Sequence, residues 1–373
     1  MNGKYKNLTI IATLVVIGAI ILAYMTTIPR NVVTPTPTPT PTPQFTLLQG
    51  AGASFVFPQV NEWAQLFYAK KGIRVNYQSV GSGAGLSMFF QGTVDFACSD
   101  PPLSKDVWEK NKGEIIQIPW LIGGVVVIYN IPEVPVNTTI RLDEIALAKI
   151  YKGEIAYWDD SYIKNLNPGI AGALPHKEII AVYRSDSSGT TEIFTTYLNK
   201  ATNNMWPKEL VGKTVNWPVI ALGRGIGGKG NEGVTQIVKQ TPYSIGYVEW
   251  GYAIANNLPT ALLKNAAGAF VEASRETLMS ALENVNIPSS PLDDFSHVVY
   301  EAVYAPGAKS YPISALTHLI LWRRYDQARA LTIKEFLRWI LDEGYNNTIP
   351  GYVPPPQSIR MLLNNAINII ETA

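Results

Sequence analysis

Short apolar segments alternate with amphipathic ones from about Phe45 onward, and this alternation leaves few folds open to the chain. IRVNYQSV (73–80) and VDFACSD (94–100) have the length and composition of strands, whereas VNEWAQLFYAKK (60–71) and TEIFTTYLNKA (191–201) have apolar residues at helical spacing. Further strands are expected at 45–52, 122–132 and 179–186, and further helices at 86–92, 142–153 and 335–344, the last opened by a capping box at Thr332–Glu335. The alternation predicts the α/β class, with helices packed in layers against a sheet.

The composition excludes several kinds of protein. Thirty Lys and Arg balance 29 Asp and Glu to a net charge of +1, which gives no indication of nucleic acid as a partner. Cys98 is the only cysteine, so an intramolecular disulfide, a cysteine zinc site and a CxxC redox pair are excluded. With only three histidines as well, we expect no metal and no cofactor. We expect Cys98 and tryptophans such as Trp63, Trp120, Trp158 and Trp217 to pack in the interior.

Residues 1–30 are predicted to be a membrane anchor or signal segment. Leu8 to Met25 contains no charged residue, and as a helix it would reach about 27 Å, close to the thickness of a bilayer core. Lys4 and Lys6 precede it, as the positive-inside rule requires for a cytoplasmic N-terminus. No A-x-A site follows, which favours an uncleaved anchor over a cleaved signal peptide. Both interpretations place the rest of the chain outside the membrane.

Residues 31–44 are predicted to be a linker. Thr34 to Pro43 alternates threonine and proline, and proline at every second position prevents helix and sheet pairing. Such a segment favours an extended, polyproline-like rod, which at about 3.1 Å per residue would span roughly 30 Å. It would hold the folded part of the chain away from the membrane.

Three junctions between a predicted strand and the helix that follows are rich in glycine, serine and threonine. They are Gly50–Phe55, Gly81–Gly85 and Arg184–Thr191. The first turn of a helix has free N–H donors and a partial positive charge, so it attracts anions, and small residues let a ligand approach the backbone. Each junction alone could be only a cap or a turn. Together, with Arg184 leading into the third, they favour a site for a tetrahedral oxyanion.

Asp100 ends a predicted strand, and a carboxylate is out of place among anion donors unless the ligand carries its own proton. Hydrogen phosphate carries one and sulfate at neutral pH does not, so a carboxylate that accepts this hydrogen would select the first and repel the second. A turn or a cap is the alternative role for Asp100. Arg184 can make a charge-assisted contact to an oxyanion, or an exposed salt bridge with Asp186; Asp186 could instead orient Arg184.

The glycine-rich segment Gly223–Gly230 contains the pattern G-x-G-x-x-G, which is typical of a dinucleotide turn. It also nearly matches a P-loop, but Gly230 occupies the place of the serine or threonine that would hold magnesium. An extracytoplasmic domain has little access to NAD or ATP, so we expect a structural glycine loop beside the anion site. Neither G-x-S-x-G nor H-E-x-x-H occurs in the chain, so these two hydrolase signatures are missing.

Eight motifs occur in the order seen in the substrate-binding proteins of phosphate-type ABC importers, and the chain resembles this PstS-like family from about Leu48 to Val353. They are GAGASFVFP, VNYQSVGSGAG, TVDFACSDPPLS, IPWLIGGVVVIYNIP, IYKGEIAYWDD, RSDSSGTTEIFTTYL, GGKGNEG and IGYVEW. The resemblance implies a two-lobed α/β clamp with a hinge, of the periplasmic-binding-protein type (type II). Lobe I would comprise 45–121 and 312–373 and lobe II 122–311, with crossings near Leu121–Gly123 and Tyr311–Pro312.

The resemblance also implies which residues hold phosphate. They would be Ser54, Phe55 through its backbone, Ser82 and Asp100 in lobe I, and Arg184, Ser188, Gly189 and Thr190 in lobe II, with Asp186 in support. Ser54 stands where the family often has threonine, and Ser187 replaces a common glycine. The anchor and linker are similar to the arrangement in archaea and other cells without an outer membrane.

The expected function is therefore capture of inorganic phosphate at the cell surface and its delivery to the permease of an ABC transporter, by a monomer that is not an enzyme. The nearest alternative is a receptor for another oxyanion, such as sulfate, molybdate or a phosphonate. A second is a secreted phosphatase, with Ser188 as nucleophile and Asp100 as base. A third is an adhesion or signalling protein that retains only the fold.

Overall fold

The computed structural model of the chain describes residues 47–135, 138–283 and 285–372, together with Val16, Gly18 and Ala19. Almost all of the predicted anchor and the whole of the predicted linker (31–44) lie outside these residues. Among the residues that are described, no helix combines the length and the apolar character needed to cross a membrane.

One large sheet runs through the folded part of the chain. Its eight strands lie in the order β2-β1-β3-β11-β4-β8-β6-β7. Their bounds are β1 Leu47–Gly52, β2 Arg74–Ser79, β3 Phe96–Ser99, β4 Ile115–Asn130, β6 Ile180–Arg184, β7 Gly225–Gly228, β8 Ser244–Glu249 and β11 Ser314–Trp322. Two small sheets are formed by β5 (Arg141–Leu142), β9 (Leu262–Lys264) and β10 (Phe270–Val271), and by β12 (Arg324–Tyr325) and β13 (Glu371–Thr372).

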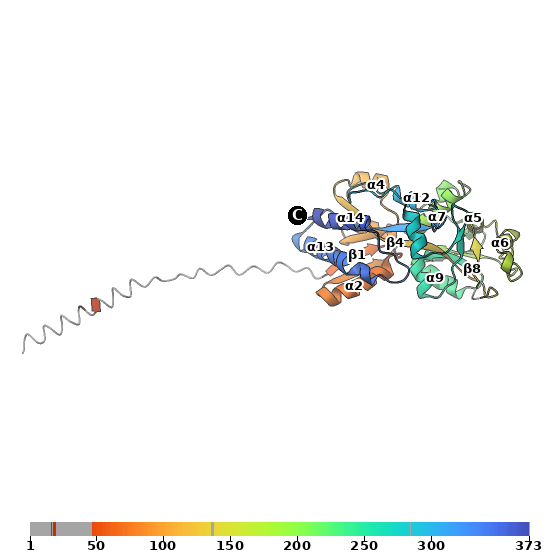
Figure 1. Ribbon diagram of the computed structural model, residues 1–373, viewed down its shortest axis with the longest axis horizontal. Coiled ribbons are helices and arrows are strands. Elements are labelled where there is room, and N and C mark those ends of the chain that lie inside the picture. The colour runs from red at the N-terminus through yellow and green to blue at the C-terminus, as the bar shows by residue number, and fades with distance from the viewer. Residues whose placement is uncertain (1–15, 17, 20–46, 136–137, 284, 373) are drawn as a thin grey trace, which may run out of the picture. The chain divides into compact units, whose positions relative to one another are not determined.

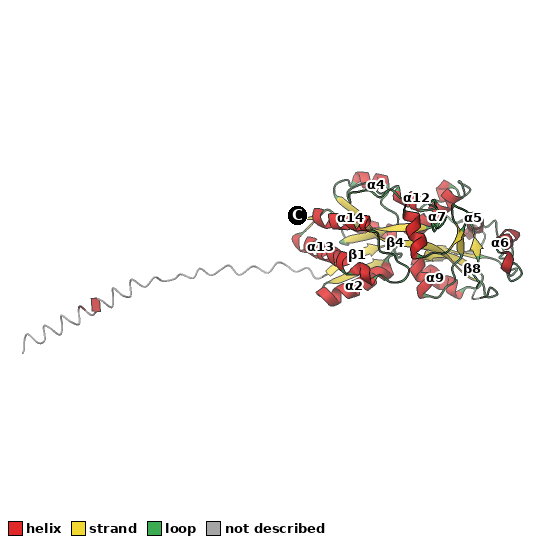
Figure 2. Ribbon diagram, viewed as in Figure 1, coloured by secondary structure: helices red, strands yellow, loops and turns green. Residues whose placement is uncertain are grey.

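Helices lie on both sides of the large sheet (Figure 2). The longer ones are α2 Phe57–Lys71, α3 Ser82–Phe90, α5 Glu144–Lys152, α7 Gly189–Ala201, α9 Gly230–Gln240, α11 Arg275–Leu282, α13 Gln327–Asp342 and α14 Gln357–Ile369. The short ones are α4 Lys105–Lys110, α6 Ser161–Leu166, α8 Pro218–Ala221, α10 Trp250–Ala255 and α12 Val298–Ala302, with 3-10 turns η1 Pro168–Ile170, η2 Lys208–Leu210 and η3 Gly344–Asn347. The predicted α/β class is confirmed.

The long strand β4 connects two halves of the sheet. Ile115–Gly124 pair with β11, next to β3, β1 and β2, whereas Val125–Asn130 pair with β8, next to β6 and β7. Figure 1 shows β1 with α2, α13 and α14 in the first half, β8 with α5, α6 and α9 in the second, and β4 between them. We refer to the elements around β1, β2, β3 and β11 as the first half, and to those around β6, β7 and β8 as the second half.

The strand directions determine where the junctions lie. In the first half β1, β2 and β3 are parallel, and β11 is antiparallel to both β3 and β4, so β4 runs in the same direction as β3. In the second half β8 is antiparallel to β4, and β6 and β7 are parallel to β8. The strands that lead into the predicted junctions therefore point from both halves toward the line where the halves meet. Ligands bind at this kind of sheet edge in α/β proteins.

The sequence predicted several element bounds wrongly. The capping box at Thr332–Glu335 is not formed: α13 begins at Gln327, capped by Asp326, and the Thr332 hydroxyl donates to the carbonyl of Ala328 inside that helix. Helix α3 begins at Ser82, four residues before the predicted start, because Gly83 and Gly85 are part of the helix. Half of the predicted glycine loop is the edge strand β7, and its last residue, Gly230, begins α9.

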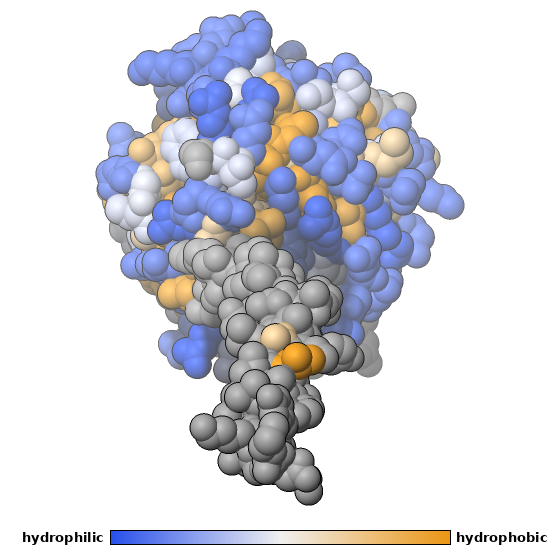
Figure 3. Space-filling view, turned by 90° about the vertical axis from the view of Figure 1, so that its left-hand side faces the viewer, coloured by the Kyte–Doolittle hydropathy of each residue, from blue (hydrophilic) through white to orange (hydrophobic). Residues whose placement is uncertain are grey.

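The interior confirms the packing predictions. Cys98 and the four named tryptophans are between 0 and 2% exposed. Trp63 contacts Trp120 edge to face in the first half, and Trp217 packs beside Tyr151 in the second. At the end face in Figure 3, the described surface is mostly hydrophilic, with hydrophobic residues visible between the polar ones. Aromatic side chains therefore pack in the interior of both halves, on either side of β4.

Two glycines bring the first and second junctions together. A Cβ atom added to Gly85 in α3 would lie 2.2 Å from the Gly52 Cα and 2.6 Å from its nitrogen. Gly52 itself has φ +143°, a conformation that favours glycine, and its carbonyl accepts hydrogen bonds from Val80 and Gly81. This close approach places the start of α3 directly beside the loop that follows β1.

We predict that Gly85→Ala destabilises the protein although alanine is the better helix former. Helix propensity alone would stabilise the variant by about 1 kcal/mol, but the new methyl group would overlap backbone atoms that have no room to move, at a cost of about 1–3 kcal/mol or more. Gly169→Ala is the control, because an added Cβ there meets nothing within 4 Å. Urea unfolding measures both; equal stability of the two variants would contradict the prediction.

Candidate functional site

The predicted site residues from the two halves of the sheet lie together where the halves meet. Ser54 and Phe55 stand between β1 and α2, Ser82 begins α3, and Asp100 follows β3. From the second half, Arg184 is the last residue of β6, Ser188 is the N-cap of α7, and Gly189 and Thr190 form the first turn of that helix. All eight residues are buried, and Arg184 is the most exposed of the polar ones at 4%.

Asp100 is the acidic centre of this cluster. Its Oδ2 accepts a hydrogen bond from the Thr190 hydroxyl across the two halves at 3.3 Å, and its backbone N–H donates to Ser82 Oγ at 3.4 Å. Its Oδ1 is buried and has no hydrogen-bond partner among the described residues. Burial raises the pKa of Asp100 to about 7, although Arg184 and the Thr190 hydroxyl act to lower it. The carboxyl of Asp100 therefore keeps its proton to a higher pH than an exposed aspartate does.

Arg184 supplies the positive charge, and Asp186 orients it. Arg184 Nε and Nη2 donate to the two carboxylate oxygens of Asp186 at 2.7 and 2.6 Å, while Nη1 donates to Thr190 Oγ1 at 3.3 Å. The two side chains are 1 and 10% exposed, so the alternative of an exposed salt bridge is wrong. Burial acts to raise the pKa of Asp186, but Arg184 and the Gly230 N–H together bring it below its usual range.

The start of α7 carries the remaining predicted donors. The Ser188 hydroxyl oxygen accepts the N–H of Thr191 at 3.1 Å, as an N-cap, and its own hydrogen remains available to donate. A Cβ added to Gly189 would lie 2.5 Å from Ser82 Oγ and 2.7 Å from Asp100 Oδ2. Glycine is therefore needed at position 189 for the start of α7 to approach Ser82 and Asp100 this closely.

Phe55 and His318 support the site from the first half. Phe55 is fully buried, and its carbonyl accepts a hydrogen bond from the Tyr352 hydroxyl at 2.6 Å. His318 Nδ1 lies 3.1 Å from the Asp100 carbonyl, which makes Nδ1 the protonated nitrogen. Burial lowers the pKa of His318 to about 4, so this histidine is neutral at physiological pH and adds no charge beside Asp100.

The sequence did not single out three residues that complete the cluster: Asn231, Glu232 and Tyr252. Asn231 donates to Ser54 Oγ through its backbone nitrogen at 3.0 Å and through Nδ2 at 2.9 Å. The Tyr252 hydroxyl lies 2.7 Å from the Ser54 carbonyl oxygen and 2.9 Å from Glu232 Oε1. The motif GGKGNEG contains Asn231 and Glu232, but its glycines pointed to a loop. Its strand–helix context could have identified them as a fourth junction.

The cluster offers several hydrogen-bond donors and one acidic acceptor to a small oxyanion. Hydroxyls, helix N-termini and a guanidinium are donors for anionic oxygens, and Asp100 is an acceptor among them. Neither His176, His297 nor His318 contacts Ser188 in the described structure. No group of three or more histidine, cysteine or acidic residues is placed to hold a metal within the described residues.

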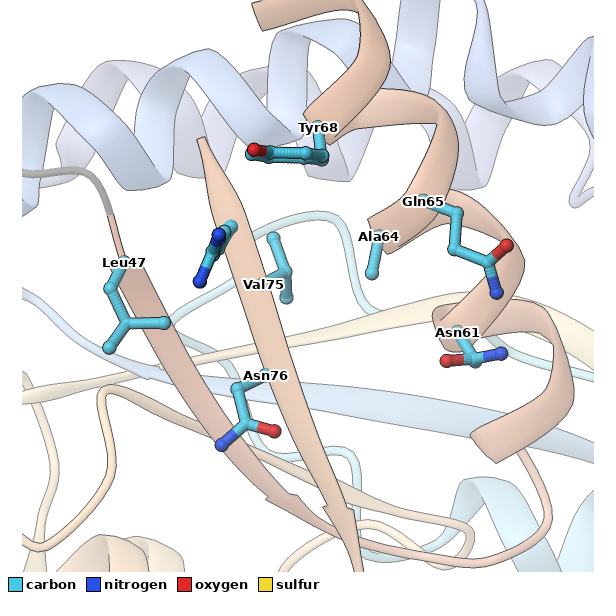
Figure 4. A pocket seen from close by; sticks show the side chains of 8 residues that line it. Leu47, Asn61, Ala64, Gln65, Tyr68, Val75 and Asn76 are labelled. Atoms are coloured by element: carbon cyan, nitrogen blue, oxygen red, sulfur yellow. The ribbon is translucent and has the colours of Figure 1, made fainter. Parts of the chain in front are cut away.

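A separate surface pocket lies against the edge of the sheet (Figure 4). It is lined by Leu47, Asn61, Ala64, Gln65, Tyr68, Arg74, Val75 and Asn76, from β1, α2 and β2. None of these is a predicted site residue. This pocket, which lies in the first half, is therefore distinct from the cluster, which both halves form.

Known proteins match most of the chain. A model of the PBP superfamily domain matches residues 35–343. The phosphate-binding protein PstS of Methanocaldococcus jannaschii is 41% identical over 338 residues, which cover 87% of this chain and 86% of that protein. The chain belongs to the PstS family. Another PstS relative, from Haemophilus influenzae, is 37% identical over 319 residues and covers 85% of this chain and 91% of its own length.

A solved structure has a fold similar to that of this chain. It is a high-affinity periplasmic phosphate-binding protein bound with phosphate, 23% identical, with a TM-score of 0.68 over 85% of this chain and 92% of that chain. At this identity the likeness concerns the fold. The predicted two-lobed α/β architecture of the periplasmic-binding-protein type is confirmed. The PstS relatives are named as binding proteins and not as enzymes.

We predict that Asp100→Asn flattens the pH dependence of stability in phosphate-free buffer. The pKa of the folded carboxyl lies above its usual value, so its stabilising contribution is complete below about pH 4 and is lost as the pH rises through about 7. At about 1.4 kcal/mol per pKa unit, the effect amounts to a few kcal/mol. Urea unfolding at several pH values between 4 and 8 measures it.

Asp106→Asn is the control for this prediction, because Asp106 is exposed on α4. That variant should retain the pH profile of the unsubstituted protein. If Asp100→Asn leaves the pH dependence of the unfolding free energy unchanged, the pKa of this carboxyl is not raised and the prediction is wrong.

Proposed function

We propose that this protein captures inorganic phosphate between its two lobes and delivers it to the permease of an ABC transporter. The observation that carries the proposal is the chain of contacts from Asp100 through Thr190 to Arg184, which joins an acid and a cation from different halves in one buried cluster. The PstS relatives are named as phosphate-binding proteins, which supports the same ligand. The proposed ligands are those predicted: Ser54, Phe55, Ser82, Asp100, Arg184, Ser188, Gly189 and Thr190.

The balance of donors and acceptors favours phosphate over sulfate. Arg184, the serine hydroxyls and the helix N-termini offer hydrogens to unprotonated oxygens, whereas Asp100 Oδ1, which has no partner among the described residues, needs a hydrogen from the ligand. Hydrogen phosphate has both kinds of oxygen. Sulfate would bring an oxygen lone pair against a carboxylate, which costs several kcal/mol in a buried site.

We further propose that the lobes are 45–121 with 312–373, and 122–311, and that they open and close about the crossing strand. Strand β4 exchanges β11 for β8 between Gly124 and Val125, close to the proposed crossing. Contacts that need closure include the Gly83 N–H to the Ser187 carbonyl at 3.1 Å and the Ser79 hydroxyl to Glu232 at 3.0 Å. Neither lobe alone surrounds the ligand, so binding should favour the closed form.

The location and partners form part of the same proposal. We propose that the segment 1–30 anchors the protein to the plasma membrane, that 31–44 separates it from the folded part, and that the receptor acts outside the membrane as a monomer. The charge-free run from Leu8 to Met25 supports the anchor. Detergent-dependent extraction of the full-length chain from cell membranes, lost when residues 1–30 are deleted, would test it.

Isothermal titration of residues 45–373 with phosphate and with sulfate tests the ligand. We expect phosphate to bind at micromolar concentration or tighter, and sulfate to bind much more weakly or not at all. Asp100→Asn should reduce the ratio of the two affinities by roughly 10–100-fold, because it removes a charge-assisted hydrogen bond to one ligand and a repulsion from the other.

Asp95→Asn is the matched control for this titration. Asp95 is also a buried acid of the first half, but it accepts from the Gln49 backbone and pairs with Arg329, away from the site. Its substitution should leave the phosphate-to-sulfate ratio unchanged. Equal or tighter binding of sulfate by the unsubstituted protein would refute the proposal, and turnover of a chromogenic phosphate ester would favour the phosphatase alternative.

A further inference from the structure

Both polar atoms of the Asn231 side chain, which lies at the centre of the cluster, have hydrogen-bond partners. Asn231 is the second residue of α9 and is 0% exposed. Its Oδ1 accepts the backbone N–H of Glu249 at 2.9 Å, and its Nδ2 donates to Ser54 Oγ at 2.9 Å and to Thr190 Oγ1 at 3.3 Å. Because the Glu249 N–H can only donate, it fixes the amide with its oxygen toward β8 and its nitrogen toward the site.

The contacts of Asn231 determine what the Ser54 hydroxyl can do. A serine hydroxyl has one hydrogen to donate and two lone pairs that accept. Ser54 Oγ receives hydrogens from both the backbone nitrogen and the Nδ2 of Asn231, at 3.0 and 2.9 Å. Both acceptor positions are therefore occupied, and the hydroxyl is left to act as a donor.

The Thr190 hydroxyl is in the same situation on the other half. Its oxygen receives hydrogens from Arg184 Nη1 and from Asn231 Nδ2, both at 3.3 Å. Its own hydrogen is then directed to Asp100 Oδ2, also at 3.3 Å. One amide thus contacts a hydroxyl from each half and occupies an acceptor position on both.

We propose that Asn231 is a positioning residue that makes Ser54 an obligate donor when the lobes close. The inference rests on the proposed function, since it assigns Asn231 a role in holding phosphate without touching it. A hydroxyl that is free to rotate can present a lone pair to an anion, which repels it, whereas a hydroxyl with both lone pairs occupied cannot. Because Asn231 and Ser54 come from different halves, this orientation is set only in the closed form.

A packing role would also make Asn231 sensitive to substitution, so the test must separate the two. A residue that acts through Ser54 loses its effect when the Ser54 hydroxyl is absent, whereas a packing residue keeps it. The two substitutions should therefore be non-additive in phosphate affinity, as a double-mutant cycle measures.

The experiment is isothermal titration of inorganic phosphate into the unsubstituted protein, Asn231→Ala, Ser54→Ala and the double variant. We expect Asn231→Ala and Ser54→Ala each to raise Kd about tenfold, as the loss of one well-oriented hydrogen bond does. The Kd of the double variant should exceed the higher of the two single-variant Kd values by no more than about twofold. Should Asn231→Ala fail to fold, Asn231→Asp keeps the shape and replaces the donor with an acceptor, and it should raise Kd more than tenfold.

Asn265→Ala is the matched control. Asn265 is 1% exposed, and its side chain also makes both kinds of bond, donating to the Gly307 and Ala308 carbonyls and accepting from the Ala267 and Ala269 backbone nitrogens, away from the site. Its substitution should lower the unfolding temperature without changing Kd. A Kd raised about a hundredfold in the double variant, which is the product of the two single effects, would overturn the positioning role. It would not contradict the proposal that the protein binds phosphate. Absence of phosphate binding by the unsubstituted protein would instead overturn the proposed function.

Discussion

One hydroxyl, that of Thr190, connects the two charges on which the site depends. It donates to Asp100 and accepts from Arg184, so an acid from the first half and a cation from the second meet through a neutral group. Burying a charge costs free energy unless the charge is paired, and Arg184 and Asp100 differ in how they are paired. Arg184 is held by both oxygens of Asp186, whereas Asp100 keeps one oxygen without a partner in the described residues. Asp186 balances the charge of Arg184, which still has N–H groups for a ligand, whereas one oxygen of Asp100 lacks a donor; this suits a ligand with several acceptor oxygens and one hydrogen.

The attraction for an anion is built from local dipoles and one guanidinium, with almost no contribution from net charge. The chain as a whole carries +1. Helices α2, α3, α7 and α9 all begin next to the line where the halves meet, because each follows a strand that points toward it. Each directs the N–H groups of its first turn to the same place, where those of Gly83, Gly230 and Asn231 bind protein groups from other elements. Fixed dipoles of this kind need no rearrangement when an anion arrives, and they stay effective at salt concentrations that screen surface charge.

The sequence predicted the architecture well because periodicity and turn chemistry are local properties. The strands and helices around residues 47–99 and 180–201 follow directly from apolar spacing and from glycine and serine at their ends. The clustering of the candidate site residues was predictable for the same reason: they occupy junctions, and parallel strands bring junctions to one edge. Asn231 was not singled out, because its role comes from the pairing of β7 with β6 and from its contact with a loop 177 residues away in the chain.

The capping box at Thr332 failed for a related reason. Thr332 and Glu335 have the right spacing, but Asp326 provides a cap six residues earlier and the helical pattern continues through the threonine. A local motif competes with its neighbours, and the sequence alone does not say which of two caps is used. The full length of β4 was also underestimated: the sequence predicted a strand at 122–132, whereas β4 spans Ile115–Asn130 and its first part pairs with β11.

The unbroken course of β4 limits how the molecule can move. A flexible loop between the halves would let them move freely, but here the connection is a strand that pairs with β11 up to Gly124, with a bulge opposite Thr317 and His318, and with β8 from Val125. The proposed opening of the lobes would then twist this strand near Gly124 and Val125, where its partner changes. A strand in this position would guide the proposed open form back to one closed geometry, in which donors and acceptors from the two halves lie 2.9–3.3 Å apart.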